Sequence, residues 1–347
     1  MEYIYNSDLL QLQSLEQNLK VSIFGQDEAI NSIVEKLMIS TAGLSETNKP
    51  LASFLFTGST GVGKTELAIE LAKNLNLEFI RFDMSEYSSD HSVSTLIGAA
   101  SGLKGYDEGG LLTNKIKEHP KSVLLLDEIE KADKIILNTF LQVLDYGTLT
   151  DTKGNKIDFS NVIIIMTSNL GANAKSTMGF GSNSSDNRND EINKFLSPEF
   201  RARIDSQIEF NPLTKDMVKN IATKFIDELE LKLHKQIKTM ELTSNAFDEI
   251  VDQAFTTKLG ARHIKKVINN TIKQKLAYEL LFGEFKTNDS VTIDFIDNNF
   301  VYLFSNNSPL NNTNIFQTAY EAQEYAKANP GVTITRTEDG QYYKIKE

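Results

Sequence analysis

Residues 58–65 carry the sequence feature that most restricts how this chain can fold. They read GSTGVGKT, which fits the P-loop pattern G-x-x-x-x-G-K-[ST]. The apolar run LASFLFTG leads into this loop, and a helical pattern follows it to about Leu75. A strand, a glycine-rich loop and a helix in this order indicate an α/β fold with a phosphate site, because loop N–H groups and the helix N-terminus face the same anion.

The individual residues of this loop have predictable roles toward ATP and Mg²⁺. Lys64 is expected to place its charge beside the β- and γ-phosphates, and the Thr65 hydroxyl is expected to ligate Mg²⁺. The backbone N–H groups that surround the phosphate oxygens are expected from Gly58, Ser59, Thr60, Gly61, Val62 and Gly63.

Further buried strands are predicted downstream of the loop, with helical stretches between most of them. They are apolar runs at residues 78–83, 122–128, 161–169 and 207–210. Continuous apolar strands that alternate with helices are typical of a parallel sheet covered on both faces.

One of these strands ends in two acidic residues that complete a hydrolysis site. The run VLLLDE ends in Asp127, which is expected to hold Mg²⁺, and Glu128, which is expected to act as general base toward the attacking water. A strand that merely ends in two acids before a solvated helix is the simpler alternative, and the upstream P-loop argues against it.

The chain divides into three parts by its patterns. Residues 1–212 predict a large ATPase domain, with helices at 7–19 and from Gln26 to about Ala42 before the first strand. Residues 213–304 predict a mostly helical lid domain that ends in a small hairpin. For residues 305–347 the pattern predicts a polar linker followed by a small α+β tail, which consists of a short helix and two strands.

Composition narrows the class of partner. The formal net charge of −11 argues against nucleic acid or an anionic membrane as the main ligand. Cysteine is absent, which excludes disulfides and Cys-type zinc sites. The N-terminus lacks a signal-peptide pattern and no apolar run approaches the length of a membrane span, so we expect a cytoplasmic protein that does not bind membranes.

Several longer motifs resemble the second ATPase module of ClpA and ClpC, in the Clp/Hsp100 family of AAA+ ATPases. They lie between about Val21 and Phe285 and read FGQDEAI, GSTGVGKT, RFDMSEY, LLLDEIEKA, LQVLDYGTLTD, SPEFRARID, LGARHIKKVI and LAYELLFG. The resemblance implies an AAA+ fold, a hexameric ring with a central pore and ATP-driven translocation of unfolded protein. ClpA and ClpC carry an N-terminal domain and a first ATPase module ahead of this one, so the sequence fits either a fragment or a single-ring protein.

The resemblance also assigns residues around the nucleotide. Ile23 and Phe24 are similar to the residues that flank the adenine, although two apolar residues near a helix start need no such role. Asn169 resembles the sensor-1 residue that orients the attacking water. A polar residue that ends a strand is its simpler explanation.

Two arginines resemble residues that contact the γ-phosphate. Arg203 is similar to the arginine finger that acts on the site of the neighbouring subunit, and spacing favours it over the nearby Arg201. Arg262 resembles sensor 2, a lid residue that acts on its own subunit's site. A surface charge on a helix is the alternative for each.

The pore loop departs from the family pattern of Gly, aromatic, Val, Gly. Here Leu103 replaces the aromatic residue that grips substrate, and Lys104 replaces Val. Leucine still packs on substrate side chains but offers less area than tyrosine. A second pore loop is expected near Lys153–Lys156.

A short apolar island lies in the Gly-, Ser- and Asn-rich segment 171–190. It consists of Met178, Gly179 and Phe180, where protease-coupled Clp motors carry a tripeptide that docks on ClpP. Two hydrophobic residues in a polar loop can also occur by chance. The resemblance thus implies an ATP-dependent unfoldase that feeds a ClpP-like peptidase. The alternatives are a chaperone or disaggregase without a peptidase, a nucleic-acid remodeller, and a scaffold that does not hydrolyse ATP. Residues 305–347 are candidates to recruit substrates or an adaptor, and a terminal fold without such a role is the alternative.

Overall fold

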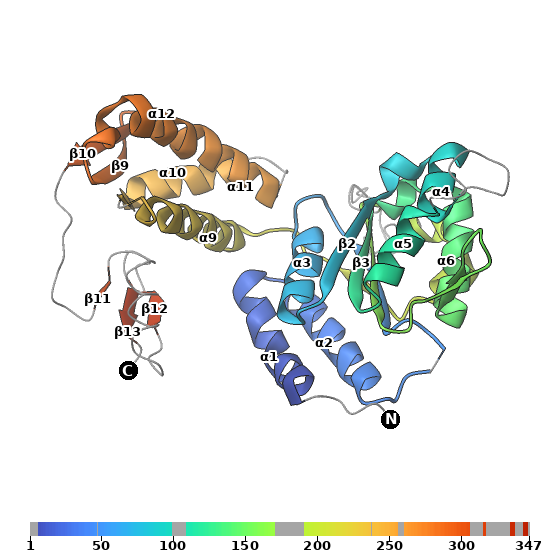
Figure 1. Cartoon of the computed structure of the whole chain (residues 1–347). Helices are drawn as coiled ribbons and strands as arrows, with labels where there is room; N and C mark the ends of the chain where they lie inside the picture. Colours follow the sequence, from blue (N-terminus) through green and yellow to red (C-terminus); the bar gives the residue numbers. More distant parts are fainter. Residues whose placement is uncertain are drawn as a thin grey trace, which may run out of the picture. The chain divides into compact units, whose positions relative to one another are not determined.

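The computed structural model describes residues 6–46, 48–98, 109–170, 191–236, 238–255 and 260–305, together with three short strands further on. The chain forms two compact units, Met1–Pro212 and Leu213–Glu347. Figure 1 shows both units, and each is described by itself below. None of the described helices is both long and apolar enough to cross a membrane.

A five-stranded sheet in the order β2-β3-β6-β1-β7 forms the centre of the first unit. Every neighbouring pair in it is parallel, which confirms the parallel α/β fold expected from the sequence. The strands are β1 (Ala52–Thr57), β2 (Glu78–Asp83), β3 (Ser122–Asp127), β6 (Val162–Ser168) and β7 (Ser206–Glu209).

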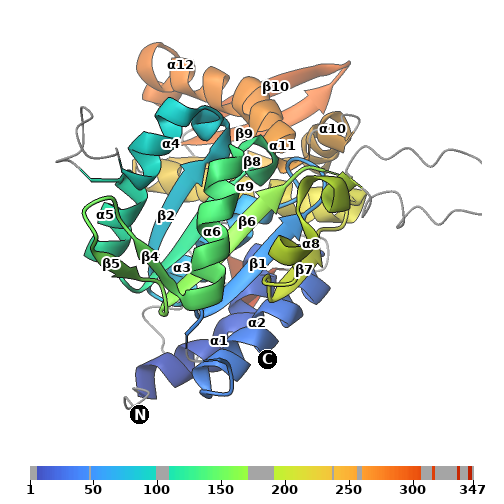
Figure 2. The same cartoon turned by 90° about the vertical axis from the view of Figure 1, so that its right-hand side faces the viewer.

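Helices cover both faces of this sheet, with α1, α2 and α3 on one side and α4, α5 and α6 on the other (Figures 1 and 2). Alternate residues of β3 serve the two faces, since Val123 and Leu125 pack in one hydrophobic cluster and Leu124 and Leu126 in the other. The helices are α1 (Asn6–Ser22), α2 (Asp27–Thr41), α3 (Lys64–Asn74), α4 (Asp90–Ile97), α5 (Leu111–Glu118), α6 (Lys134–Tyr146) and α8 (Pro198–Arg201).

Parallel strands bring their carboxyl ends to one edge of the sheet. In the register of the sheet Asp83 lies beside Asp127, and Thr57 lies beside Ser168. The P-loop follows Thr57, Glu128 follows Asp127, and Asn169 follows Ser168. The residues proposed for nucleotide chemistry are therefore collected at this edge, where α/β proteins bind their ligands.

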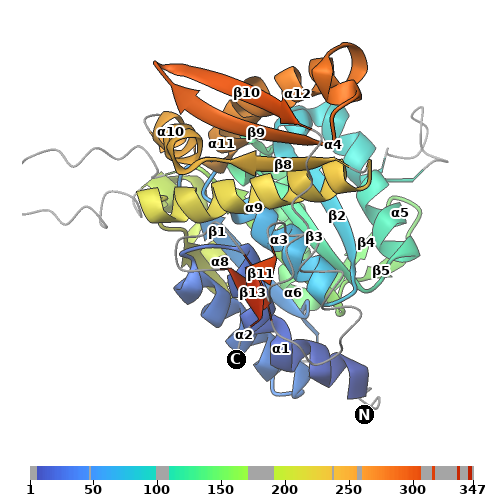
Figure 3. The ribbon, with the colours of Figure 1, turned by 90° about the vertical axis from the view of Figure 1, so that its left-hand side faces the viewer.

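The second unit is mostly helical, as expected, and its sheet appears in Figure 3. The helices are α9 (Lys215–His234), α10 (Ser244–Phe255), α11 (Ala261–Ile268) and α12 (Gln274–Phe282), with a π-helical segment, η4 (Asn269–Lys273), between the last two. Strands β9 (Ser290–Ile296) and β10 (Asn299–Ser305) form the expected antiparallel hairpin.

Some short elements had no clear signal in the sequence. Strand β8 (Thr239–Leu242) pairs in parallel with β9, and β4 (Thr148–Thr150) pairs with β5 (Lys156–Asp158). Segments of three or four residues are too short to show a period. In the tail, β13 (Tyr343–Ile345) pairs with β12 (Ile334–Arg336), as the expected hairpin requires, and also with an unexpected third strand, β11 (Ile315–Phe316). The expected tail helix lies outside the described residues.

Candidate active site

The P-loop connects β1 to α3 through a turn that depends on its glycines. Gly58, Gly61 and Gly63 have φ angles of 135°, 81° and 113°, which side chains disfavour. A Cβ atom on Gly58 would also lie only 2.8 Å from the carbonyl oxygen of Phe210. The loop therefore packs directly on the segment that follows β7, and α3 begins at Lys64 with its N-terminus toward the loop.

Lys64 is almost fully buried, at 7% exposed. Its ammonium group donates hydrogen bonds to the carbonyl oxygens of Gly58 and Ser59, and to Oδ1 of Asn169 at 2.9 Å. Thr60 donates to the same Asn169 oxygen at 3.3 Å. The structure thus brings the P-loop lysine and the expected sensor-1 residue into contact, although 105 residues separate them in the sequence.

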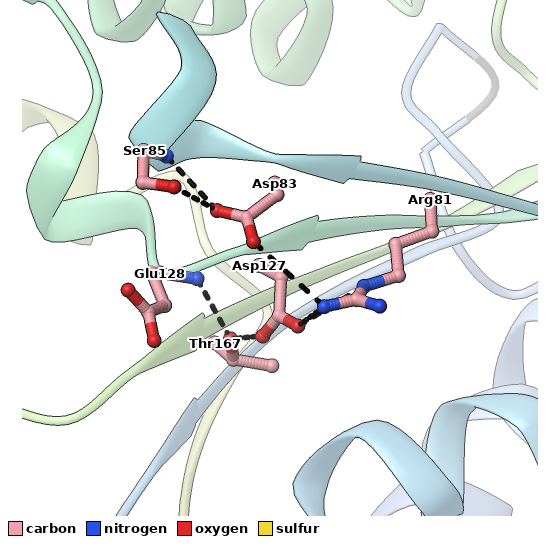
Figure 4. Close-up of polar contacts among 6 residues, drawn as sticks. All are labelled: Arg81, Asp83, Ser85, Asp127, Glu128 and Thr167. Carbon is pink, nitrogen blue, oxygen red and sulfur yellow. Dashed lines mark hydrogen bonds and ion pairs between the residues drawn. The ribbon is translucent and has the colours of Figure 1, made fainter. Parts of the chain in front are cut away.

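Asp127 is buried and held from two sides (Figure 4). Its Oδ2 accepts hydrogen bonds from Nε and Nη2 of Arg81, at 3.1 and 2.7 Å, and its Oδ1 accepts one from the Thr167 hydroxyl. Arg81 lies on β2, and its Nη2 is also 3.9 Å from Oδ2 of Asp83. The carboxylate expected to serve Mg²⁺ is therefore paired with an arginine that the sequence interpretation gave no role.

Glu128 adopts a left-handed backbone conformation, with φ 56° and ψ 54°. Non-glycine residues pay a strain of about 1–3 kcal/mol for sparsely populated conformations, which persist mainly at functional sites. The hydroxyl of Thr167 holds this turn by accepting a hydrogen bond from the Glu128 N–H at 3.0 Å. The Glu128 carboxylate points away from the Asp127–Arg81 pair in Figure 4. It has no hydrogen bond or ion pair among the described residues, which suits a group that binds water.

A second carboxylate fixes Asn169. Oε1 of Glu130 accepts a hydrogen bond from the Asn169 N–H at 3.0 Å, and its Oε2 is buried with no partner in the described part of the chain. Three residues that contact the site had no role assigned from the sequence, namely Arg81, Glu130 and Thr167. Their only signal was membership of the motifs RFDMSEY, LLLDEIEKA and the strand that ends in MTSN.

The residues expected near the adenine lie where α1 gives way to α2. Ile23 is buried, and its Cγ2 atom is 3.9 Å from the position that a Cβ on Gly63 would take. Phe24 is partly buried. Ile23 therefore lies beside the end of the P-loop, and its place next to the adenine stays a prediction.

Gln26 follows these residues and is 1% exposed. Its side chain exchanges two hydrogen bonds of 2.9 Å with the backbone N–H and carbonyl of Asn211. It also donates to the Val62 carbonyl at 3.4 Å. One side chain thus connects the start of α2, the P-loop and the end of the first unit.

Arg203 and Arg262, the two arginines expected to contact the γ-phosphate, lie in different units. Arg203 forms an ion pair with Asp145 of α6 and donates to the Glu199 carbonyl at 2.7 Å. The hydrogen bond with Asp145 raises the pKa of Arg203, whose guanidinium is charged at physiological pH in any case. The competitor Arg201 lies nearby, and its Nε is buried without a partner in the described structure. Arg262 is exposed in the first turn of α11 in the second unit.

Other expected site residues are placed only in part. Of Lys153–Lys156, the first three residues lie in the turn between β4 and β5, and Lys156 begins β5. The Asp151 carboxylate accepts hydrogen bonds in this turn from the N–H groups of Lys153 and Asn155. The pore-loop residues Leu103 and Lys104 and the apolar island Met178, Gly179 and Phe180 lie outside the described residues.

The side chains at the sheet edge suit a nucleoside triphosphate with a divalent cation. The turn offers N–H groups, Lys64 supplies a buried positive charge, and Thr65 and Asp127 supply the oxygen ligands that Mg²⁺ prefers. Among the described residues, no three His, Cys, Asp or Glu side chains gather to hold a metal by themselves. This arrangement fits a cation bound together with phosphate oxygens, as in other P-loop proteins.

Comparison with protein families identifies two consecutive domains. Residues 49–207 match the AAA domain (Cdc48 subfamily), and residues 213–293 match the C-terminal, D2-small domain of ClpB protein. The two matches meet near the boundary between the two compact units.

Individual relatives agree with these matches. A ClpA homolog protein of Fuscovulum blasticum is 44% identical over 300 residues, which cover 85% of this chain and 38% of that protein. The chaperone protein ClpB of Clostridium perfringens is 40% identical, with 85% of this chain and 35% of that protein covered. The chain therefore spans little more than a third of these relatives.

A solved structure is also similar. It is a closed-state cryo-EM reconstruction of "Hsp104:ATPyS and FITC casein", with a TM-score of 0.78 and 35% identity. The match covers 87% of this chain and 53% of that one.

Proposed function

This chain belongs to the Clp/Hsp100 family of AAA+ ATPases, and we propose that it acts as an ATP-driven protein unfoldase. The observation that carries the proposal is the contact between Lys64 and Asn169 beside Asp127 and Glu128, at one edge of the sheet. The relatives support a protein substrate. One is named a chaperone, and the similar structure was solved with casein.

The site residues have different roles in ATP hydrolysis in this proposal. The P-loop N–H groups and Lys64 bind the phosphates, while Thr65 and Asp127 are positioned to hold Mg²⁺. When bound, Mg²⁺ neutralises charge on the phosphate oxygens. Glu128 takes the proton of the attacking water. Asn169 orients that water, because Glu130 fixes its backbone N–H while Lys64 and Thr60 hold its side-chain oxygen.

Arg203 supplies positive charge to the site of a neighbouring subunit in this proposal. Within its own chain it is held by Asp145 and the Glu199 carbonyl, so the guanidinium is oriented before a neighbour arrives. A hexameric ring provides that neighbour, and Leu103 and Lys104 then line the pore through which substrate moves. Arg262 acts on its own subunit's nucleotide from the second unit.

The experiment that tests the proposal uses Glu128→Gln. This variant should bind ATP with unchanged affinity but hydrolyse it at least about a hundredfold more slowly, because the water loses its base. It should also fail to unfold a fluorescent protein that carries an unstructured tail. Full ATP turnover in the variant would remove Glu128 from the mechanism, and wild-type hydrolysis without any unfolding would refute the unfoldase assignment.

Whether the chain delivers unfolded substrate to a peptidase is a separate question. The ClpB relatives are named chaperones, which favours refolding or disaggregation of the product. The sequence island Met178–Phe180 favours docking to a ClpP-like peptidase. Deletion of the island should leave ATP hydrolysis and unfolding unchanged and abolish substrate degradation by an added ClpP-type peptidase. If the intact chain drives no degradation while it unfolds substrate, the chaperone function is correct.

A further inference from the structure

The second unit contains a hollow of about 370 Å³ between α9 and the helical run α11–η4. These helices pack against each other in the second unit, as Figures 1 and 3 show. Four lysines line the hollow, which we call the lysine cleft: Lys232, Lys265, Lys266 and Lys273. A volume of this size is within the range of small-ligand sites, which is about 300–1,000 Å³.

Helix geometry explains how the cleft forms. On α9, Phe225, Leu229 and Lys232 recur at intervals of four and three residues, so they lie on one face. On the opposite side the π-helical segment η4 separates α11 from α12 and contributes Lys273. Single π turns widen a helix locally and often occur at functional sites.

The lysines of the cleft differ in their partners from three other lysines of this unit. Lys215, Lys238 and Lys275 each form an ion pair with a nearby carboxylate. None of the four cleft lysines forms an ion pair within the described part of the chain.

Unpaired charges of one sign in a small hollow repel one another. Glu228 is the one acidic side chain in the described lining, so the cleft carries a net charge of about +3 from four lysines and one glutamate. A multivalent anion would relieve this repulsion and would gain several charge-assisted hydrogen bonds.

The chemistry of the lining selects the kind of anion. All four cations are lysines, which bind phosphate as point charges, and no arginine in the described lining supplies a planar fork for bidentate recognition of a carboxylate or a phosphate. The ammonium group of Lys265 lies 4.7 Å from the centre of the Phe225 ring. That ring face is thus occupied by a cation and is not free to stack on a base.

From these observations we propose that the lysine cleft binds a compact polyphosphate group, either inorganic polyphosphate or the phosphate tail of an organic phosphate. The site is distinct from the P-loop, because it lies wholly within the second unit. It does not depend on the unfoldase function proposed above.

Binding can be measured by isothermal titration calorimetry with inorganic tripolyphosphate as the probe. The full chain should carry Lys64→Ala, so that the P-loop contributes little, in buffer of about 0.15 M ionic strength. In this background, the pair Lys265→Gln and Lys273→Gln should weaken tripolyphosphate binding at least about tenfold, since two of four ammonium groups are lost. The matched control pair, Lys215→Gln and Lys275→Gln, removes the same charge from paired lysines of the same unit and should change the affinity less than about twofold.

Three results would overturn the proposal. The first is no detectable tripolyphosphate binding in the Lys64→Ala background. The second is an equal loss in the control pair, which would show a general charge effect. The third is tighter, cleft-dependent binding of an oligoglutamate peptide than of tripolyphosphate, which would make the cleft a site for acidic peptides. Titration with ATP in the same background distinguishes the two phosphate sources, since only an organic-phosphate site should favour ATP over tripolyphosphate.

Discussion

Replacing Gln26 with alanine should destabilise the first unit by about 2–4 kcal/mol. The side chain is 1% exposed and exchanges two hydrogen bonds of 2.9 Å with the backbone of Asn211. Removal of one partner from a buried hydrogen bond leaves the other unsatisfied, at about 1–3 kcal/mol each. Two such groups sum to about 2–6 kcal/mol, and the expected loss is about 2–4 kcal/mol because water that enters the space left by the side chain satisfies part of it.

Hydrogen exchange, read by mass spectrometry on peptides from β1 and β6, measures this change in the first unit alone. The expected loss corresponds to exchange about 30- to 700-fold faster for the slowest amides in these strands. Gln17→Ala is the matched control. Gln17 is exposed on α1, and no hydrogen bond is shown for its side chain in the described structure, so its replacement should change exchange less than about twofold.

A second variant separates hydrogen bonding from packing. Gln26→Glu keeps the shape of the side chain but replaces the donor to the Asn211 carbonyl with an oxygen. A buried carboxylate beside carbonyl oxygens has a raised pKa, so the variant should be least stable above that pKa and should approach the wild type as the pH falls below it. If Gln26→Ala exchanges like Gln17→Ala, or if Gln26→Glu shows no such recovery, the two hydrogen bonds do not stabilise the unit.

Substitutions at three further residues test the site at the sheet edge. Arg81→Gln should lower the Mg²⁺ concentration needed for half-maximal ATP hydrolysis, because Arg81 competes with Mg²⁺ for Asp127 Oδ2. A higher Mg²⁺ concentration at half-maximal hydrolysis would show instead that Arg81 positions Asp127. Thr167→Val should reduce ATP turnover at least about tenfold with little change in nucleotide affinity, whereas Thr167→Ser should retain activity, because the hydroxyl joins Asp127 to the Glu128 N–H. Arg203→Ala should bind ATP normally but lose hydrolysis, and turnover per chain that does not change on dilution of the wild type would exclude action in trans.

The central sheet could be predicted from the sequence because its inner strands are buried on both faces. The apolar runs at residues 122–128 and 161–169 carry this signal without any alternation, and the structure has β3 and β6 there, buried at every position. The P-loop could also be predicted from the sequence, because its glycines and lysine occupy fixed positions between a strand and a helix. Together these patterns also imply that Asp127 and Asn169 lie at one edge of the sheet, because parallel strands end on the same side.

The partners of these residues could not be predicted in the same way. Arg81 reaches Asp127 because β2 lies next to β3 in a register that places Asp83 beside Asp127. Strand order and register depend on the packing of the whole sheet, and no local pattern reports them. The left-handed backbone of Glu128 is likewise a product of tertiary contacts, since local propensity disfavours it.

The contact between the P-loop and the end of the first unit suggests how a nucleotide can act on the second unit. Gly58 packs on the Phe210 carbonyl, and the next residue, Asn211, is held by Gln26, which also contacts Val62. The chain enters the second unit two residues later, at Leu213. Phosphate binding that shifts either end of the P-loop must therefore change a contact of this short segment. Close-packed backbone transmits such small shifts, because it has no free volume in which to absorb them.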